Sequence, residues 1–184
     1  MKKILVFIVV VFIVIAVGHY YVKNKKVIPS TDTTLKHEKF AIDPQNATYT
    51  IYDDTITLVH GESNTEASPG STATISTHFF GNEAVGDLDK DGRPDTALLL
   101  VQDTGGTGVF YYAVVALNTV DGYKGTNAIF LGDRISPQTT EITNGKVTVN
   151  YADRKPNQPM STEPSVGVSK YLVVKNGILV EVTK

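Results

Sequence analysis

The sequence contains no cysteine. Disulfide bonds, thiolate metal sites and a lipidated cysteine at a lipoprotein cleavage site are therefore excluded. Basic residues are scarce in the larger part of the chain, since residues 46–184 carry 10 Lys and Arg against 16 Asp and Glu, a formal charge of −6. An acidic domain without a basic stripe argues against nucleic-acid binding and is compatible with cation binding.

Helical periodicity is also lacking. Beyond residues 1–22, no segment shows an apolar stripe that repeats every 3.6 residues. The apolar content of 41% is nevertheless enough for a hydrophobic core, and a length of 184 residues predicts one domain with an appendage.

The appendage is a membrane signal over residues 1–22. As a signal anchor, the apolar run Ile4 to Val22 has about 19 residues, near the length that crosses a bilayer. As a signal peptide, it would be cleaved near Ala16-Val17-Gly18. Tyr20 and Tyr21 favour the anchor, because aromatic residues gather at the membrane interface. Either route exports the rest of the chain.

Residues 23–45 are polar and without periodicity, which predicts a linker. In an alternative interpretation, Phe40-Ala41-Ile42 docks on the following domain.

Residues 46–184 have the pattern of a β domain. Three short turn sequences, Asp53-Asp54, Asn144-Gly145 and Asn176-Gly177, are flanked by runs rich in β-branched and aromatic residues. Asn-Gly between such runs is a strong hairpin signal, because both central residues of the turn need φ > 0. The pattern predicts a mainly β, antiparallel sandwich or open barrel, preceded by one N-terminal transmembrane or signal helix.

Three further strands and two connections are expected in this domain. Buried strands are expected at Thr96–Val101 and Val109–Leu117, and a short one at Asn127–Leu131. Gly61–Ser71 reads as a polar loop. Thr104–Gly108 reads as a glycine turn, since it lacks the Gly-Lys-Ser/Thr ending of a phosphate loop and runs into a strand.

The chemistry of the chain is concentrated in the loop 87–95. Carboxylates fall at relative positions 1, 3, 5 and 9, namely at Asp87, Asp89, Asp91 and Asp95, with Gly92 at position 6. Alternate residues of a tight loop can direct oxygen ligands at one calcium ion. Arg93, at position 7, would contribute its backbone carbonyl. The alternative is an Asp/Gly-rich turn that binds nothing, but its four like charges would repel one another.

This loop differs from an EF-hand, because position 12 is Leu98 instead of a glutamate and strands are expected on both sides. Phe80-Gly81 followed by Ala84–Asp95 resembles the calcium loop of FG-GAP repeats, found in integrin-type propellers and in many bacterial surface proteins. The resemblance implies that the four aspartates are side-chain ligands of Ca²⁺. It does not imply a propeller, which needs several repeats where this chain has one.

The region from Asn46 onward is also similar to a group of membrane-anchored bacterial proteins, a likeness that implies no particular activity. Together with the segment 1–22, this likeness implies a single-pass protein of the bacterial cell membrane with its C-terminal domain outside the cytoplasm, or a secreted protein if the signal is cleaved.

Other candidate sites are weak. His37, His60 and His78 are scattered and lack helical metal spacing. The irregular stretch Tyr151–Ser165 suits either a solvated loop or a ligand-binding one.

Two functions remain open. The first is a tethered extracytoplasmic β domain that binds one structural calcium ion and serves adhesion, assembly or ligand capture, with a protein or a glycan as partner. The second is a cell-envelope hydrolase whose ion is structural or catalytic, which would need acid and base groups beside the ion. Glu83 and His78 are the nearest such residues in the sequence. The first function is favoured over the second, and the sequence leaves open whether the chain is an enzyme.

Overall fold

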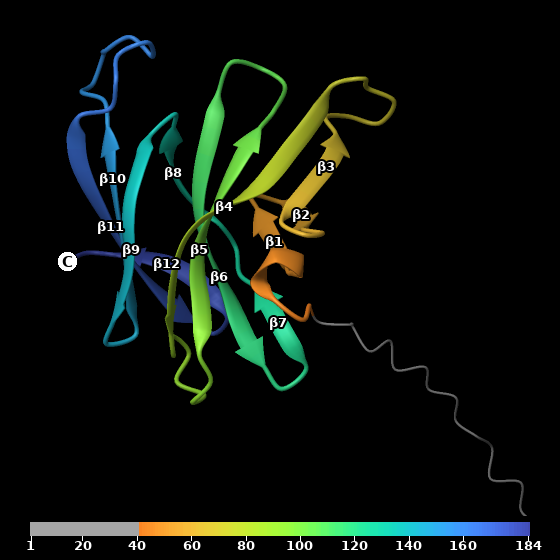
Figure 1. Cartoon of the computed structure of the whole chain (residues 1–184), viewed down its shortest axis with the longest axis vertical. Coiled ribbons are helices and arrows are strands. Elements are labelled where there is room, and N and C mark those ends of the chain that lie inside the picture. Colours follow the sequence, from red (N-terminus) through yellow and green to blue (C-terminus); the bar gives the residue numbers. More distant parts are fainter. Residues whose placement is uncertain (1–40) are drawn as a thin grey trace, which may run out of the picture. The chain divides into compact units, whose positions relative to one another are not determined.

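The computed structural model describes residues 41–184, which form antiparallel β-sheets stacked in layers (Figure 1). The largest sheet has the strand order β3-β4-β5-β6-β7, with β8 also paired to β6. A four-stranded sheet has the order β12-β11-β10-β9, and β1 and β2 form a separate hairpin. The mainly β, antiparallel prediction is therefore confirmed, and the sheets of this part of the chain do not close into a barrel. The predicted helix over residues 1–22 and residues 23–40 of the predicted linker lie outside the described residues.

The elements in chain order are the 3-10 turn η1 (Pro44–Asn46) and the strands β1 (Thr48–Ile51), β2 (Asp54–Thr57), β3 (Glu62–Glu66), β4 (Thr74–Gly86), β5 (Asp95–Asp103), β6 (Val109–Thr119), β7 (Gly122–Gly125), β8 (Ile129–Asp133), β9 (Ser136–Thr143), β10 (Lys146–Asp153), β11 (Val166–Lys175) and β12 (Ile178–Val182). Over the span 41–184, no helix is long and apolar enough to cross a bilayer.

The described chain begins in contact with the β domain. Ala41 forms an isolated antiparallel bridge with Tyr123, whose backbone N–H donates to the Ala41 carbonyl at 2.8 Å. Asp43 then caps η1 by accepting a hydrogen bond from the Gln45 N–H at 2.8 Å. Ala41 thus makes the docking contact of the alternative interpretation of this segment.

Both Asn-Gly hairpins form as predicted. Asn144 and Gly145 have φ of 53° and 71°, and Asn176 and Gly177 have φ of 52° and 77°. Thr143 pairs with Lys146 across the first turn. Positive φ at both central residues gives the turn twist that matches the right-handed twist of the flanking strands.

The first hairpin forms, but its predicted turn was wrong by one residue. Ile51 pairs with Asp54, so the turn residues are Tyr52 and Asp53. This register places Tyr49, Ile51 and Ile56 on one buried face. Because a shift of one residue would move that face to solvent, core packing sets the register here against the turn preference of the aspartates.

The predicted loop Gly61–Ser71 was wrong in part, since it contains strand β3. Glu62 to Glu66 pair with His78 to Thr74 of β4. The strand is mostly exposed and lies at the edge of its sheet. An edge strand with polar side chains needs no apolar pattern, which is why the sequence showed no strand signal there.

Two cores lie on opposite faces of the largest sheet. Leu98 and Leu99 are adjacent on β5, yet they are 1% and 0% exposed, respectively. Leu99 packs in the core shared with the four-stranded sheet, and Leu98 packs in the core beneath the β1–β2 hairpin. Burial on both faces explains why β5 and β6 are continuous apolar runs instead of alternating ones.

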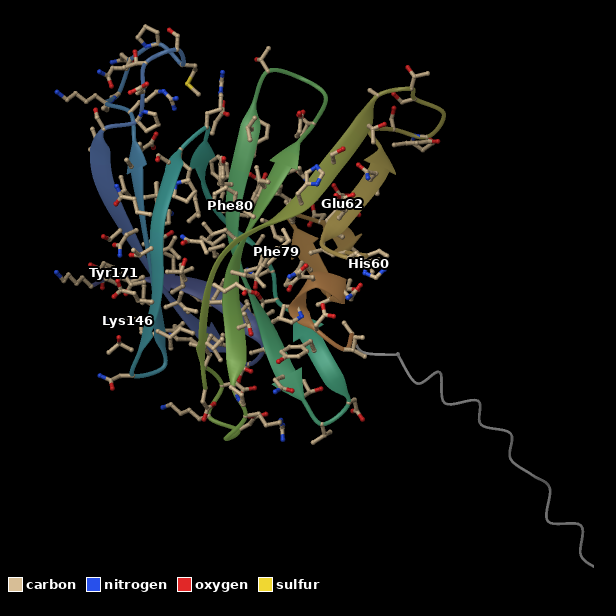
Figure 2. The ribbon with its side chains drawn as sticks, viewed as in Figure 1. His60, Glu62, Phe79, Phe80, Lys146 and Tyr171 are labelled. Atoms are coloured by element: carbon tan, nitrogen blue, oxygen red, sulfur yellow. The ribbon has the colours of Figure 1, made fainter. Side chains whose placement is uncertain are left out.

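The outer face of the four-stranded sheet carries several polar contacts between neighbouring strands. The Lys146 ammonium lies 5.2 Å from the centre of the Tyr171 ring, and the two side chains lie close together in Figure 2. On the same face, the Ser169 hydroxyl donates to the Asn150 Oδ1 at 2.6 Å, and the Asn150 amide donates to the Thr139 hydroxyl at 2.9 Å. This face is therefore held by exposed cross-strand pairs, each of modest stabilising effect.

The irregular stretch expected at Tyr151–Ser165 is shorter than predicted, because β10 continues to Asp153. Arg154 fixes the remaining loop by donating to the carbonyls of Thr162 and, at 2.9 Å, Arg134. The neighbouring Asp133 has a pKa below its usual value, chiefly because the Arg134 side chain donates hydrogen bonds to it.

Gly125 marks the closest approach of β7 to the β1–β2 hairpin. A Cβ at Gly125 would lie 2.3 Å from the Thr48 carbonyl oxygen and 2.5 Å from Tyr49 Cδ1. We expect Gly125→Ala to lower the free energy of unfolding by about 1–3 kcal/mol, the range typical of overpacking. Gly167→Ala is the matched control, because a Cβ there meets no atom within 4 Å. Equal urea midpoints for the two variants would contradict the close packing of this layer.

Candidate metal centre

The loop 87–94 connects the longest strand of the domain to its most buried one. β4 ends at Gly86 and β5 begins at Asp95. A Cβ at Gly86 would lie 2.8 Å from Ile142 Cγ2, so glycine lets β9 pack against the entry to the loop. Within the loop, Lys90 and Gly92 have φ of 68° and 85°. These left-handed residues reverse the chain and bring Asp95 back toward Asp87.

Three of the four predicted side-chain ligands converge. One carboxylate oxygen from each of Asp87, Asp89 and Asp95 lies within 4.8 Å of the others. Calcium binds oxygen at 2.3–2.6 Å, so oxygens on opposite sides of one ion are about 5 Å apart at most. The separation in this group is therefore compatible with a single cation between the three carboxylates.

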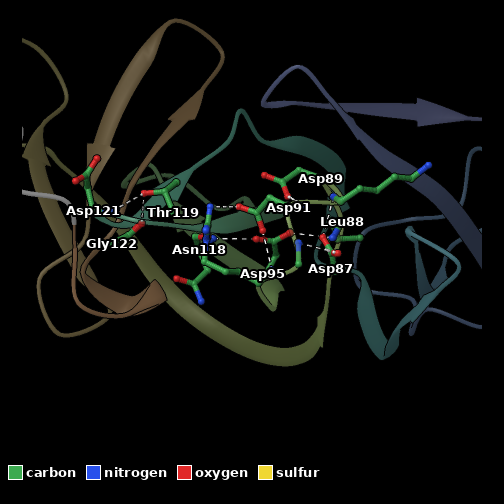
Figure 3. A network of polar contacts seen from close by, with 12 residues as sticks. Asp87, Leu88, Asp89, Asp91, Asp95, Asn118, Thr119, Asp121 and Gly122 are labelled. Atoms are coloured by element: carbon green, nitrogen blue, oxygen red, sulfur yellow. Dashed lines mark hydrogen bonds and ion pairs between the residues drawn. The ribbon is translucent and has the colours of Figure 1, made fainter.

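Asp95 is the anchor of this group. It is fully buried, with 0% exposure. Its Oδ2 accepts a hydrogen bond from the Leu88 N–H at 2.8 Å, and its Oδ1 accepts one from the Asn118 N–H at 2.9 Å (Figure 3). The pKa of Asp95 is raised, chiefly by burial of the carboxylate, while these two N–H donors act in the opposite direction. The charge of Asp89 adds to the increase. A bound cation would favour the ionised form.

Asp87 and Asp89 are exposed and shape the loop by accepting from its own backbone. Asp87 accepts from the N–H groups of Lys90 at 2.8 Å and Gly92 at 3.2 Å. Asp89 accepts from the Asp91 N–H at 3.1 Å. Each oxygen retains a free lone pair, so these hydrogen bonds position the carboxylates without using up their capacity to bind an ion.

Asp91 is oriented differently from the other three. Its Oδ1 accepts from the Arg93 N–H at 2.8 Å, and its Oδ2 pairs with the Arg93 guanidinium. The Asp91 carboxylate is therefore paired with the Arg93 guanidinium and lies outside the group of three. Its ligand role and that of the Arg93 carbonyl remain predictions from the spacing.

The loop is fastened to the rest of the domain at two further points. The Arg93 Nε donates to the Asn118 carbonyl at 2.7 Å. Leu88 points into the core between the two larger sheets and is 3% exposed. These two contacts connect the loop to the end of β6 and to that core. The role of Asn118 was not predicted, because it acts through its backbone N–H and carbonyl, which any non-proline residue supplies.

The chemistry available at this centre is that of a hard-cation site. Its converging ligands are all carboxylates, which suit calcium or magnesium better than soft metals. Within residues 41–184, no histidine joins the group. His78 and Glu83, the nearest candidates for acid and base chemistry in the sequence, are not part of it.

Comparison with known proteins adds no further assignment. No family model matches the chain, and neither the curated proteins nor the solved structures include a match to it. The resemblance to an FG-GAP calcium loop accordingly depends on the aspartate spacing and receives no support from a family match.

Proposed function

We propose that loop 87–95 binds one calcium ion that stabilises the β domain, and that the domain is a binding module tethered outside the bacterial cell membrane. The observation that carries the metal site is the convergence of Asp87, Asp89 and Asp95 within 4.8 Å. Asp95 is buried and hydrogen-bonded, which keeps one ligand in place before an ion arrives. Preorganisation of this kind reduces the entropy lost on binding.

The proposed effect of the ion is structural. Three carboxylates this close repel one another, and a divalent cation removes that repulsion. An ion that binds the folded chain and not the unfolded one stabilises the fold by mass action, by about 2.7 kcal/mol at a concentration 100 times its Kd. The stabilisation would act where the loop meets β6 and the core, through Asn118 and Leu88.

The proposed location follows from the apolar segment of residues 1–22, which is the right length for a signal anchor. Calcium is the expected ion because a loop without the closing glutamate suits the weaker sites of extracellular modules. Adhesion, assembly or ligand capture is the proposed role. The hydrolase alternative would need a general acid or base at the ion, and we find no observation in residues 41–184 that favours it.

A thermal unfolding experiment on the full chain tests the metal site. Saturating calcium is expected to raise the melting temperature relative to chelator. Asp89→Ala should abolish this increase with little change in the melting temperature in chelator, because Asp89 is exposed and accepts only one hydrogen bond, from the Asp91 N–H.

Glu163→Ala is the matched control, since it removes one exposed carboxylate from the distant loop 154–165. It should retain the full response to calcium. If wild type shows no shift at millimolar calcium, or if Asp89→Ala shifts as much as wild type, the proposed metal site is wrong.

A further inference from the structure

A second feature lies at the other end of β4, where strands β2 and β3 diverge. The two strands are joined at one end, where Val59 and Glu62 exchange backbone hydrogen bonds of 2.8 and 3.2 Å. Glu62 and His60, labelled in Figure 2, lie at this joined end. In residues 41–184, β2 then pairs only with β1, and β3 pairs only with β4. Two strand edges with unpaired backbone groups therefore border the gap between them.

A cleft of about 350 Å³ occupies this gap. Its walls come from the first hairpin and from the β3–β4 connection, and its floor comes from β4 and β5. It is lined by Ile51, Tyr52, Asp54, Thr55, Ile56, Thr65, Glu66, Ala67, Ser68, Pro69, Ile75 and Gln102. This volume is within the range of ligand-binding pockets.

The charge of the cleft has one sign. Asp54 and Glu66 contribute carboxylates from its two walls, and no Lys, Arg or His lines it. Both carboxylates are exposed. Glu66 accepts one hydrogen bond, from the Gly70 N–H to its Oε2 at 2.9 Å. The site is therefore electrostatically complementary to a cation and unfavourable for an anion.

The floor of the cleft combines an apolar side chain with an amide, and its rim carries an aromatic ring. Ile75 and the buried Gln102 form part of the floor, and the Gln102 amide is fixed by donating to the Thr77 hydroxyl at 3.1 Å. Tyr52 stands at the rim, 74% exposed. Its φ of 54° is unusual for a bulky residue and places the ring edge-on to Tyr112, with centroids 6.2 Å apart. An exposed aromatic face beside carboxylates favours cation–π contact.

We propose that this cleft binds an extended peptide segment of a partner protein that carries a lysine or arginine side chain. The peptide backbone pairs with the free edges of β2 or β3, which is the mode of β-strand addition. Its cationic side chain lies between Asp54 and Glu66, with its aliphatic stem against Tyr52. The proposal names the partner class of the binding module and is independent of calcium, since none of the three metal-site aspartates lines the cleft.

Titration calorimetry of the full chain with short synthetic peptides tests this proposal. The probe is the blocked peptide Thr-Lys-Val-Lys-Thr, and the comparison peptides are its serine analogue, Thr-Ser-Val-Ser-Thr, and an analogue with N-methylated backbone amides. We expect the lysine peptide to bind, with an affinity that falls as salt is raised. The serine analogue should bind roughly 3- to 10-fold more weakly, as expected for the loss of two exposed ion pairs. The N-methylated analogue should not bind, because it cannot donate to a strand edge.

Matched variants locate the site. The double variant Asp54→Asn and Glu66→Gln should bind the lysine peptide as weakly as wild type binds the serine analogue. Glu163→Gln removes an exposed charge elsewhere and should bind as wild type does. An unchanged melting temperature in each variant excludes a folding defect as the cause.

Four results with the full chain would overturn the proposal. They are no binding of the lysine peptide, equal binding of the serine and lysine peptides, unchanged binding by the double variant, and binding of a neutral N-acetylglucosamine tetrasaccharide in place of the peptide. Binding that becomes detectable only after deletion of residues 23–40 would also overturn it, because the occupant would then be a segment of the chain itself.

Discussion

Replacement of Asp95 by alanine is expected to lower the free energy of unfolding by about 2–6 kcal/mol, since two N–H donors lose their acceptor at about 1–3 kcal/mol each. Those donors are the backbone N–H groups of Leu88 and Asn118. Burial of the carboxylate, which raises the pKa of Asp95, offsets part of this loss in the absence of an ion. The loss should therefore be larger in calcium than in chelator, as measured by urea unfolding of the full chain.

Asp95→Asn provides the control for this prediction. The asparagine keeps the volume and one acceptor oxygen but replaces the other oxygen with a donor, so one of the two hydrogen bonds is lost. The free energy of unfolding of Asp95→Asn should lie between those of wild type and Asp95→Ala. Calcium should raise it only weakly. Asp95→Ala with wild-type stability in both conditions would show that Asp95 does not anchor the loop.

Tyr49→Ala is expected to destabilise the chain by about 3–5 kcal/mol, the usual cost of truncating a large buried aromatic side chain. Tyr49 is 0% exposed and lies at the centre of the core between the β1–β2 hairpin and the largest sheet. Its hydroxyl donates to the Pro44 carbonyl at 2.7 Å, and burial raises the pKa of that hydroxyl far above its usual value. The side chain thus joins η1, the hairpin and β5 in one packed unit.

Tyr49→Phe separates the packing effect from the hydrogen bond. It keeps the ring in the core and removes only the hydroxyl, so the expected loss is about 1 kcal/mol. Equal urea midpoints for Tyr49→Ala and Tyr49→Phe would contradict the assignment of this residue to the core. A hairpin that unfolds separately from the sheets would appear as a second transition in Tyr49→Ala.

At the metal centre, local sequence patterns determine where the loop lies but not how its carboxylates are oriented. Aspartate spacing and the glycine at position 6 select the loop, because ligands on alternate residues and a left-handed turn are local properties of the chain. The orientation of each carboxylate is not local. Asp91 turns to the Arg93 side chain, which is itself held by the Asn118 carbonyl 25 residues away in sequence. Spacing alone treats the four aspartates as equivalent and does not contain this difference.

Among the strands, too, some features are set by local sequence and others by tertiary contacts. Asn144-Gly145 and Asn176-Gly177 determine their own hairpins, because the conformational preference for positive φ resides in those residues. The turn at Tyr52 and Asp53 opposes such preferences, and β3 has no apolar signal at all. The position of this turn is set by the burial of Tyr49 and Ile51. Strand β3 forms because it pairs with β4.

The sequence by itself determined the β class, the two Asn-Gly turns and the position of a loop with the ligand spacing of a calcium site. Each of these depends on residues within about ten positions of one another. The tertiary structure alone decided which aspartates converge, which of the two cores lies on each face of β5 and that a cleft with acidic walls lies between β2 and β3. These features depend on segments brought together by packing, whose contacts leave no pattern along the chain.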